Sequence, residues 1–572
     1  MLVYRDAERL ADAAAEIAAL DRLLRGLEQD CDRDRAVEAL IDAGALEAAV
    51  VDARNPERDA YGAVEAAWRL VTLQAGRLFR FSRRGDPDQA RAAARHARRA
   101  LADARRTEPP ARLTIRTPEG YAWYALYPES YLAAAERFLE SSAPYPAVVV
   151  GLRGIGASLS AVVAAALEAG GREVESLTVR PRGEVFDRSV RLDDRLQRRL
   201  RPRAEAGAWF LIVDEGPGQS GSSFAGTAAA LNGVGAGDEQ IVLFPSVASD
   251  GRNLGSAEAR GRWGRHRKLQ VGFEVLRDQV APELHRARDL SGGLWRRLVC
   301  EDLAAPPIAP QYERRKYLSE DGQVLFKYAG LGRSGRRRMA RAEQLSEAGF
   351  TPEPRSFRDG FIASDFVPGR PLRRRAGQGE AVRRAAAYLG WLGRNARTGA
   401  DVTGDELFPM ITRNVELALG QPGLGRLAGL DAWRPRLAGA PAVAIDGRLA
   451  PHEWIRSERG LLKTDALDHH DDHFLPGATD LAWDVAGFAV EWGLGETEAR
   501  DFAAEAAAAA GDPTLPGRLP FYETAYLAFR TGWTQLAAQT MAENSDRRGL
   551  NRQQARYRAR LAEALGRLEA AS

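Results

Sequence analysis

The segment 210–223 constrains the fold of this chain more than any other stretch. It opens with the apolar run FLIV, which indicates a strand buried on both faces, as in a parallel sheet. The run ends at two adjacent carboxylates, Asp214 and Glu215, and the turn GPGQ leads from them into the small residues SGSS at the start of a helix. A strand, an acidic tip and a helix in this order predict an α/β fold with its functional groups at the carboxyl end of the strand.

The loop and the acidic pair suit the two ends of one ligand. Small residues let backbone N–H groups approach an anion, and the positive end of the following helix attracts it. The loop residues with this predicted role are Ser220, Gly221, Ser222 and Ser223. The carboxylates repel a phosphate, so they must face hydroxyl groups, a divalent cation or a developing positive charge. A ribose 5-phosphate meets both requirements.

These residues resemble the signature of the type I phosphoribosyltransferases, in which a strand and an acidic pair precede a loop rich in threonine, serine and glycine. The resemblance implies that Asp214 and Glu215 are catalytic and hold the ribose hydroxyls of phosphoribosyl pyrophosphate, while the loop holds its 5-phosphate. The chain departs from the pattern in two ways: GPGQ is slightly longer than the usual connection, and serines stand where threonines are commoner. The alternative is a glycine-rich turn without a ligand.

Strands alternate with helices over residues 111–300, which predicts a doubly wound parallel sheet. YAWYALY (121–127) suggests a strand, and AVVVGL (147–152) suggests a buried one. The turn after AVVVGL resembles the pyrophosphate loop of the same family, and the residues to which this role carries over are Arg153, Gly154, Gly156 and Ser158. Arg180 and Arg182 are expected to close over the pyrophosphate, with a solvent-exposed hairpin as the equal alternative.

Changes in composition and the positions of helix-breaking residues divide the 572 residues into four parts. These are a helical region (1–110), the phosphoribosyltransferase-like domain (111–300), a stiff proline-containing linker (301–312) and a second enzyme-like domain (313–572). The chain has no run of about 18 apolar residues and no charged-then-apolar leader, so a cytoplasmic protein without a membrane partner is expected. A net charge of +3 does not indicate a nucleic-acid partner, and two distant cysteines do not indicate a disulfide framework.

The second half opens with a predicted hairpin, residues 313–332, that turns at Asp321-Gly322. Lys327 projects from its second strand, and Glu343 lies on the amphipathic helix that follows. A strand lysine and a helix glutamate anchor nucleotide phosphates in protein-kinase-like folds, so both residues are candidates for binding ATP. An ordinary strand lysine beside an unrelated helix is the alternative.

The segment 445–487 resembles the catalytic and metal-binding strands of the aminoglycoside phosphotransferase family. The resemblance implies that Asp465 holds Mg²⁺. The family's catalytic aspartate and metal-binding asparagine have no direct counterpart here. Either Asp446 is the catalytic base in an altered loop, with His452 or Glu453 in place of the asparagine on the metal, or the domain has lost phosphoryl transfer.

A third interpretation concerns the polar segment 468–473, DHHDDH. Histidine and carboxylate suit a transition metal. Ligands that are adjacent in sequence rarely converge without a distant partner, so a polar loop beside the nucleotide pocket is the preferred interpretation.

Together the two resemblances imply a bifunctional transferase that modifies small molecules. It would transfer a phosphoribosyl group from phosphoribosyl pyrophosphate and a phosphoryl group from ATP, with Mg²⁺ as cofactor. The sequence does not identify the acceptor, and it is compatible with a homodimer. The expected fold is a doubly wound α/β sheet with a helical amino-terminal region and a two-lobed α+β kinase-like domain at the carboxyl end. The alternative is a non-catalytic nucleotide or phosphoribosyl pyrophosphate sensor, or a scaffold, with a degenerate kinase domain.

Overall fold

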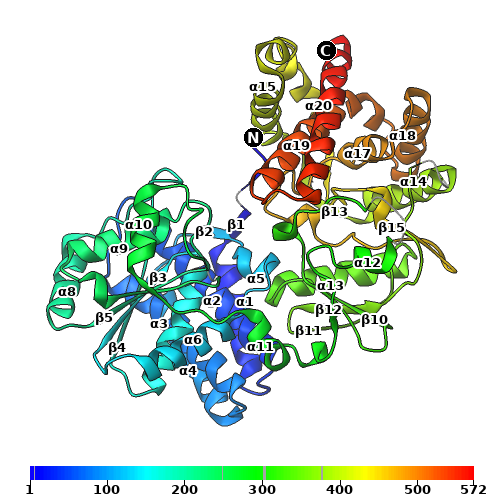
Figure 1. The fold of residues 1–572 in the computed structure, drawn as a ribbon. Helices are drawn as coiled ribbons and strands as arrows, with labels where there is room; N and C mark the ends of the chain where they lie inside the picture. Colours follow the sequence, from blue (N-terminus) through cyan, green and yellow to red (C-terminus); the bar gives the residue numbers. More distant parts are fainter. Residues whose placement is uncertain (6, 248, 301–304, 375–377, 572) are drawn as a thin grey trace.

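The computed structural model describes residues 1–5, 7–247, 249–300, 305–374 and 378–571. Figure 1 shows two bodies, one built on a parallel sheet and the amino-terminal helices, the other on a second sheet and the carboxy-terminal helices. Residues 301–304 of the predicted linker lie outside the described ranges. Within those ranges, the chain forms no helix that is both long and apolar enough to cross a membrane.

Four helices form the amino-terminal region: α1 (Ala13–Leu27), α2 (Arg33–Arg54), α3 (Ala63–Arg83) and α4 (Pro87–Arg105). Three of them begin after an aspartate whose carboxylate accepts a backbone N–H of the first turn; the three are Asp12, Asp32 and Asp86. Helices α2 and α3 pack against α7 (Ile155–Ala169), which covers one face of the parallel sheet. The amino-terminal helices therefore share one hydrophobic core with the sheet.

The parallel sheet has the order β4-β3-β5-β6-β7. Its strands are β3 (Ala147–Leu152), β4 (Val174–Val179), β5 (Trp209–Val213), β6 (Ile241–Phe244) and β7 (Arg267–Lys268). One face packs on α6 (Pro128–Ser141) and α7, the other on α8 (Asp194–Glu205) and α9 (Ser222–Gly233). Because both faces are covered, β3 and β5 are apolar throughout their buried length. Strands β3 and β5 are parallel, but the chain adds β4 on one side of β3 and β5 on the other. Such a reversal in strand order opens a crevice at the carboxyl ends of the two strands.

The connection before this sheet differs from the prediction. Strand β1 (Glu8–Asp12) pairs antiparallel with β2 (Arg112–Arg116). Residues 121–127, predicted as a strand, instead follow and overlap the short helix α5 (Glu119–Trp123). Tyr121 and Trp123 are buried there, so the alternation of aromatic residues reflects burial without a strand.

The second sheet is antiparallel with the order β11-β12-β10-β9-β8. Its strands are β8 (Arg288–Asp289), β9 (Lys316–Leu318), β10 (Val324–Tyr328), β11 (Pro354–Arg358) and β12 (Phe361–Asp365). The predicted hairpin forms between β9 and β10, and Gly322 takes the positive φ of +73° that its turn requires. Helix α13 (Gly332–Glu347) connects β10 to β11.

Helices dominate the rest of the carboxy-terminal body. They are α14 (Gln378–Asn395), α15 (Leu407–Gly425), α17 (Ala482–Trp492), α18 (Glu496–Ala510), α19 (Leu519–Gln539) and α20 (Ser545–Ala571). A hairpin, β15 (Trp454–Ser457) and β16 (Gly460–Lys463), packs between these helices and the antiparallel sheet. The shorter elements are α10 (Ala257–Arg265), α11 (Phe273–Val280), α12 (Arg296–Val299), α16 (Arg434–Leu437), β13 (Arg397–Asp401) and β14 (Pro441–Val443).

Candidate functional site

A cleft of about 710 Å³ separates the antiparallel sheet from the carboxy-terminal helices. Ile362, Ser364 and Phe366, from β12 and the segment after it, line one side. Lys327 from β10 and Asp465, just after β16, line the cleft as well. The cleft therefore combines an apolar wall with charged groups.

Lys327 is the cation among these charged groups. Its Nζ contacts the Asp465 carboxylate and lies 3.6 Å from Asp468 Oδ1. Burial alone would lower the pKa of Lys327, but the two carboxylates outweigh it and raise the pKa. Lys327 is therefore an ammonium held beside an acidic cluster.

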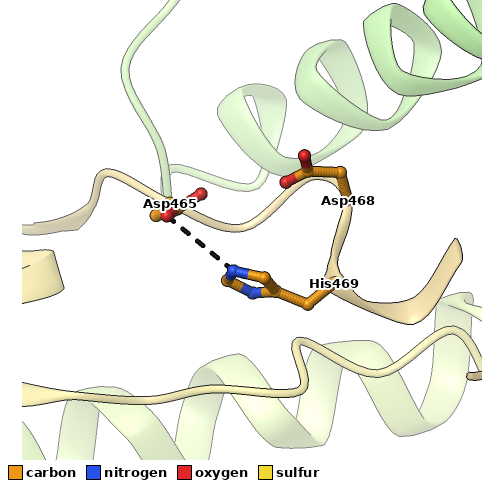
Figure 2. Close-up of side chains that lie close together, drawn as sticks. All are labelled: Asp465, Asp468 and His469. Carbon is orange, nitrogen blue, oxygen red and sulfur yellow. Dashed lines mark ion pairs between the residues drawn. The ribbon is translucent and has the colours of Figure 1, made fainter. Parts of the chain in front are cut away.

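The acidic cluster consists of Asp465, Asp468 and His469, whose ligand atoms all lie within 4.8 Å of one another. Figure 2 shows the three side chains turned toward a common space, with His469 Nε2 3.8 Å from Asp465 Oδ2. His469 Nδ1 lies 3.0 Å from the carbonyl oxygen of Asp446, so Nδ1–H donates to it and Nε2 faces the carboxylates. Although burial opposes ionisation, the nearby cations hold the pKa of Asp465 and Asp468 below the ordinary range. Two ionised carboxylates and an imidazole form a donor set that fits a divalent cation.

Asp446, predicted as the catalytic base, is instead a buried structural group. Only 1% of its surface is exposed. Its carboxylate accepts a hydrogen bond from Tyr388 Oη at 2.8 Å and pairs with Lys463 Nζ at 3.2 Å. Both oxygens are engaged inside the protein, so the structure does not favour the predicted role as the base that takes a proton from a substrate hydroxyl.

The predicted metal ligand His452 is also placed elsewhere. It is not part of the cation cluster, and its ring stacks 6.2 Å from that of Trp295. Burial lowers the pKa of His452 to about 4. Glu453, the alternative ligand, is paired with Arg448 and Lys463, and these cations outweigh burial and lower its pKa to about 2. Asp468 and His469, from the segment 468–473, take the place beside Asp465.

Glu343 does not form the predicted pair with Lys327. The buried face of α13 presents Arg338, Arg341 and Leu345, spaced by three and four residues, and Glu343 lies off this face and is exposed. Arg338 Nη2 pairs with Asp471 Oδ1 at 2.7 Å, and Arg341 Nε donates to the carbonyl oxygen of Ala466 at 2.9 Å. The arginines of α13 therefore bind the segment after β16, and Lys327 pairs with Asp465 instead of with Glu343.

A second acidic site lies in the other body, at the end of β5. Asp214 and Glu215 form no ion pair with any residue that the structure describes, and Glu215 Oε2 accepts the backbone N–H of Gly120 at 3.1 Å. Burial raises the pKa of Asp214 to about 7 and that of Glu215 to about 8. A Cβ at Gly156 would lie 2.5 Å from the Val213 carbonyl oxygen, so the loop after β3 approaches β5 closely only because glycine stands there.

The predicted phosphate loop forms the start of α9. Gly221 caps the helix in the left-handed conformation, with φ of +70°. Ser220 Oγ lies 3.1 Å from Ser222 Oγ, and Ser222 Oγ donates to the Val185 carbonyl oxygen at 2.6 Å. Ser223 Oγ accepts from Arg188 Nη1 at 3.1 Å. The segment between β4 and α8 thus already occupies part of the loop's hydrogen-bonding capacity.

The arginines predicted for pyrophosphate are tied to carboxylates of the amino-terminal region. Arg153 has no exposed side-chain surface and pairs with Asp52 at 2.6 Å and with Asp59. Arg182 pairs with Asp59 at 2.9 Å, and Arg180 pairs with Asp52. Arg153 is therefore corrected to a structural role, since its charge is neutralised inside the protein.

The remaining residues of the predicted pyrophosphate loop border a cavity of about 370 Å³. Gly154, Ser158 and Arg180 line it, and Gly154 has a φ of +128° with open space where a Cβ would stand. Ser158 Oγ lies 2.9 Å from Tyr121 Oη and donates to the Ile155 carbonyl oxygen at 2.8 Å. Three of the predicted residues therefore share one cavity, without Arg153.

Comparison with known proteins gives neither a matching family model nor a matching curated protein. Among solved structures, a choline kinase from Streptococcus pneumoniae aligns at 14% identity and a TM-score of 0.32, over 45% of this chain and 90% of its own. A choline/ethanolamine kinase family protein from Mesorhizobium loti aligns at 15% identity and a TM-score of 0.33, over 45% of this chain and 90% of its own. The structure of the gentamicin complex of APH(2")-IIa aligns at 12% identity and a TM-score of 0.30, over 50% of this chain and 94% of its own. Because these identities and TM-scores are low, any functional conclusion rests on the geometry of the sites.

Proposed function

We propose that the 710 Å³ cleft binds a nucleoside triphosphate with a divalent cation and serves phosphoryl transfer to a small molecule. The observation that carries the proposal is the meeting of Lys327 with Asp465, Asp468 and His469 at the edge of one cleft. A lysine and a cation on opposite sides of a phosphate chain are the groups that phosphoryl transfer requires.

The roles follow from the chemistry of each group. Asp465 and Asp468 would hold Mg²⁺ because it prefers carboxylate oxygens, while His469 stays oriented by the carbonyl of Asp446. The cation would neutralise charge that develops on the phosphate oxygens. Lys327 would exchange its contact with Asp465 for a phosphate oxygen, and the apolar wall formed by β12 would take the nucleobase.

A nucleotide sensor without turnover is the second candidate. Among the described residues of the loop 446–453, both carboxylates, Asp446 and Glu453, are buried and paired with Lys463. Arg448 lies in the same loop and pairs with Glu453. Phosphoryl transfer here would depend on positioning and charge, without a carboxylate base from this loop.

Titration calorimetry of ATP with Mg²⁺ tests the proposal. Binding to the wild type should be lost in Lys327→Met and in Asp465→Asn and retained in Glu343→Gln, which changes an exposed residue of α13. Release of ADP in the presence of an acceptor would then establish transfer, whereas binding without ADP would favour the sensor. A folded wild type that does not bind ATP would contradict both.

The parallel-sheet body supports a separate ligand site, for a ribose phosphate such as phosphoribosyl pyrophosphate. The supporting observation is the acidic pair Asp214 and Glu215, which lacks a cationic partner in the described chain and lies beside the start of α9. Titration of phosphoribosyl pyrophosphate with Mg²⁺ into the wild type and into Asp214→Asn/Glu215→Gln tests it. Equal binding to both proteins would exclude a role of the pair.

A further inference from the structure

The helical wall of the nucleotide cleft carries a buried arginine without a hydrogen-bond acceptor. Arg530 of α19 lines the cleft, and its side chain is 9% exposed. Its guanidinium donates no hydrogen bond to any residue in the described part of the chain, and Nε is buried without a partner. A desolvated cation without acceptors is costly, so the site calls for an oxyanion from outside the chain.

The nearby carboxylate does not supply these hydrogen bonds. Glu491 Oε1 accepts from Tyr526 Oη at 3.0 Å and from Tyr557 Oη at 2.7 Å. Arg530 Nε lies 3.7 Å from Oε1, and Arg556 Nη2 lies 3.8 Å from Oε2. Both phenols donate to Oε1, while both guanidinium groups remain beyond hydrogen-bond distance of the carboxylate.

Positive charge exceeds negative charge at this wall. Arg374, which lines the same cleft, donates its Nε to the backbone carbonyl oxygen of Glu491 at 2.6 Å. Arg530 and Arg556 both face the carboxylate of Glu491, so one carboxylate serves two guanidinium groups while Arg374 adds a third beside them. An ammonium ligand would meet an excess of positive charge here, and an anion would reduce that excess.

Aromatic rings fix the position of Arg530. Its guanidinium carbon lies 4.9 Å from the ring centroid of Trp533 and 5.4 Å from that of Tyr557. Stacking on these rings holds the planar group and reduces the entropy that a ligand must remove on binding. The arrangement is that of a preformed oxyanion receptor.

We propose that Arg530 and Arg556 form the acceptor subsite of the cleft and select a small molecule that carries a carboxylate or phosphate group. This proposal rests on the proposed function, because it assigns the chemical class of the acceptor to which the same cleft would transfer a phosphoryl group. The oxyanion docks on the guanidinium groups, and the aromatic rings contact the body of the molecule.

The test uses the full chain with Mg²⁺ and a saturating non-hydrolysable ATP analogue, so that the phosphate site is filled. Inorganic phosphate, acetate and tetramethylammonium are titrated in turn, the first two to distinguish the two oxyanions. One or both anions should bind and tetramethylammonium should not. In Arg530→Gln and Arg556→Gln the affinity should fall roughly tenfold or more, the loss expected for a charge-assisted pair.

Arg552→Gln is the matched control, since Arg552 is an exposed residue of the same helix as Arg556. It should bind the anion as the wild type does. If Arg530→Gln fails to fold, Arg556→Gln carries the test, because that side chain is 39% exposed. Equal anion affinity in the folded variants and the wild type, or tighter binding of tetramethylammonium than of either anion, would overturn the proposal.

Lys327→Met separates the two hypotheses. It removes the proposed nucleotide contact but leaves the subsite, so phosphate binding that still depends on Arg556 is expected in this background. Phosphate binding that depends on Arg556, together with no ATP binding by the folded wild type, would refute the proposed function and keep the oxyanion site. ATP binding without any anion dependence on Arg530 or Arg556 would refute the subsite alone.

Discussion

At the scale of single residues, Asp446 shows how burial changes the role of a carboxylate. It lies between Lys463 and Tyr388. Asp446→Asn should reduce the free energy of unfolding by about 2 kcal/mol, because it leaves part of the Lys463 charge uncompensated while Glu453 still pairs with it. Urea unfolding measures this loss. A stable variant with normal ATP binding and no transfer would instead restore Asp446 as the base.

Asp214 and Glu215 should make stability depend on pH. In the unfolded chain both carboxyls ionise near about pH 4, whereas in the folded chain burial raises the pKa values to about 7 and about 8. The folded state therefore binds more protons between these limits, and the free energy of unfolding falls as pH rises from about 4 to about 8.

The variant Asp214→Asn/Glu215→Gln removes this dependence. Its free energy of unfolding should rise relative to that of the wild type between about pH 5 and about pH 8. Urea unfolding at both pH values measures the difference. A constant difference would show that the two carboxyls ionise normally in the folded chain.

The sequence put forward Lys327 from its place on a strand, and Asp465 from the resemblance of the segment 445–487 to a phosphotransferase family; the structure has Lys327 on β10 and Asp465 just after β16. Arg153 could not be placed from its glycine-rich turn, because Asp52 and Asp59, which neutralise it, come from a distant part of the chain. The sequence around Arg153 contains no pattern that indicates these distant ion-pair partners.

At the scale of elements, buried strands were predictable and α5 was not. The apolar runs of β3 and β5 are short and rich in β-branched and aromatic residues, which favours strands covered on both faces over helices. The aromatic segment 121–127 lacks such a constraint, and tertiary contacts decide its structure. The Tyr121 carbonyl oxygen accepts from Leu331 N at 3.0 Å, and Arg338 Nη1 donates to the Ala122 carbonyl oxygen at 2.6 Å.

The contact between α3 and α7 depends on a glycine. A Cβ at Gly76 would lie 2.6 Å from the carbonyl oxygen of Ala161, a backbone atom that cannot move alone. Gly76→Ala should therefore destabilise the protein by about 2 kcal/mol. The control is Gly566→Ala in α20, where a Cβ meets open space and the change should be neutral or stabilising by about 0.5–1 kcal/mol. Equal melting temperatures of the two variants would contradict the close packing.

At the scale of the whole molecule, the two bodies share apolar and polar contacts. Tyr317, Phe326 and Phe361 of the antiparallel sheet belong to the same hydrophobic core as α1–α4 and the parallel sheet. Residues at the amino terminus cross to the other body, where Tyr4 pairs with Phe474 (Figure 1). The two bodies are therefore expected to unfold together, although the sequence places a linker (301–312) between the two predicted enzyme-like domains.

The charged contact between α13 and the amino-terminal helices gives a test of this coupling. Arg333 pairs with Glu16 at 2.8 Å and with Asp42 at 2.7 Å, and Arg336 pairs with Glu38. Burial, the largest effect, raises the pKa of Asp42 to about 7 despite Arg333. Removing both arginines would leave three carboxylates facing one another across the junction.

The wild type is expected to unfold in a single calorimetric transition, and Arg333→Ala/Arg336→Ala should separate it into two. The effect should be larger at about pH 8, where the carboxylates are ionised and repel one another, than at about pH 5, where Asp42 keeps its proton and the repulsion is weaker. Glu343→Ala, an exposed change on the same helix, should retain one transition. A single transition at both pH values in the double variant would show that the apolar contacts alone couple the two bodies.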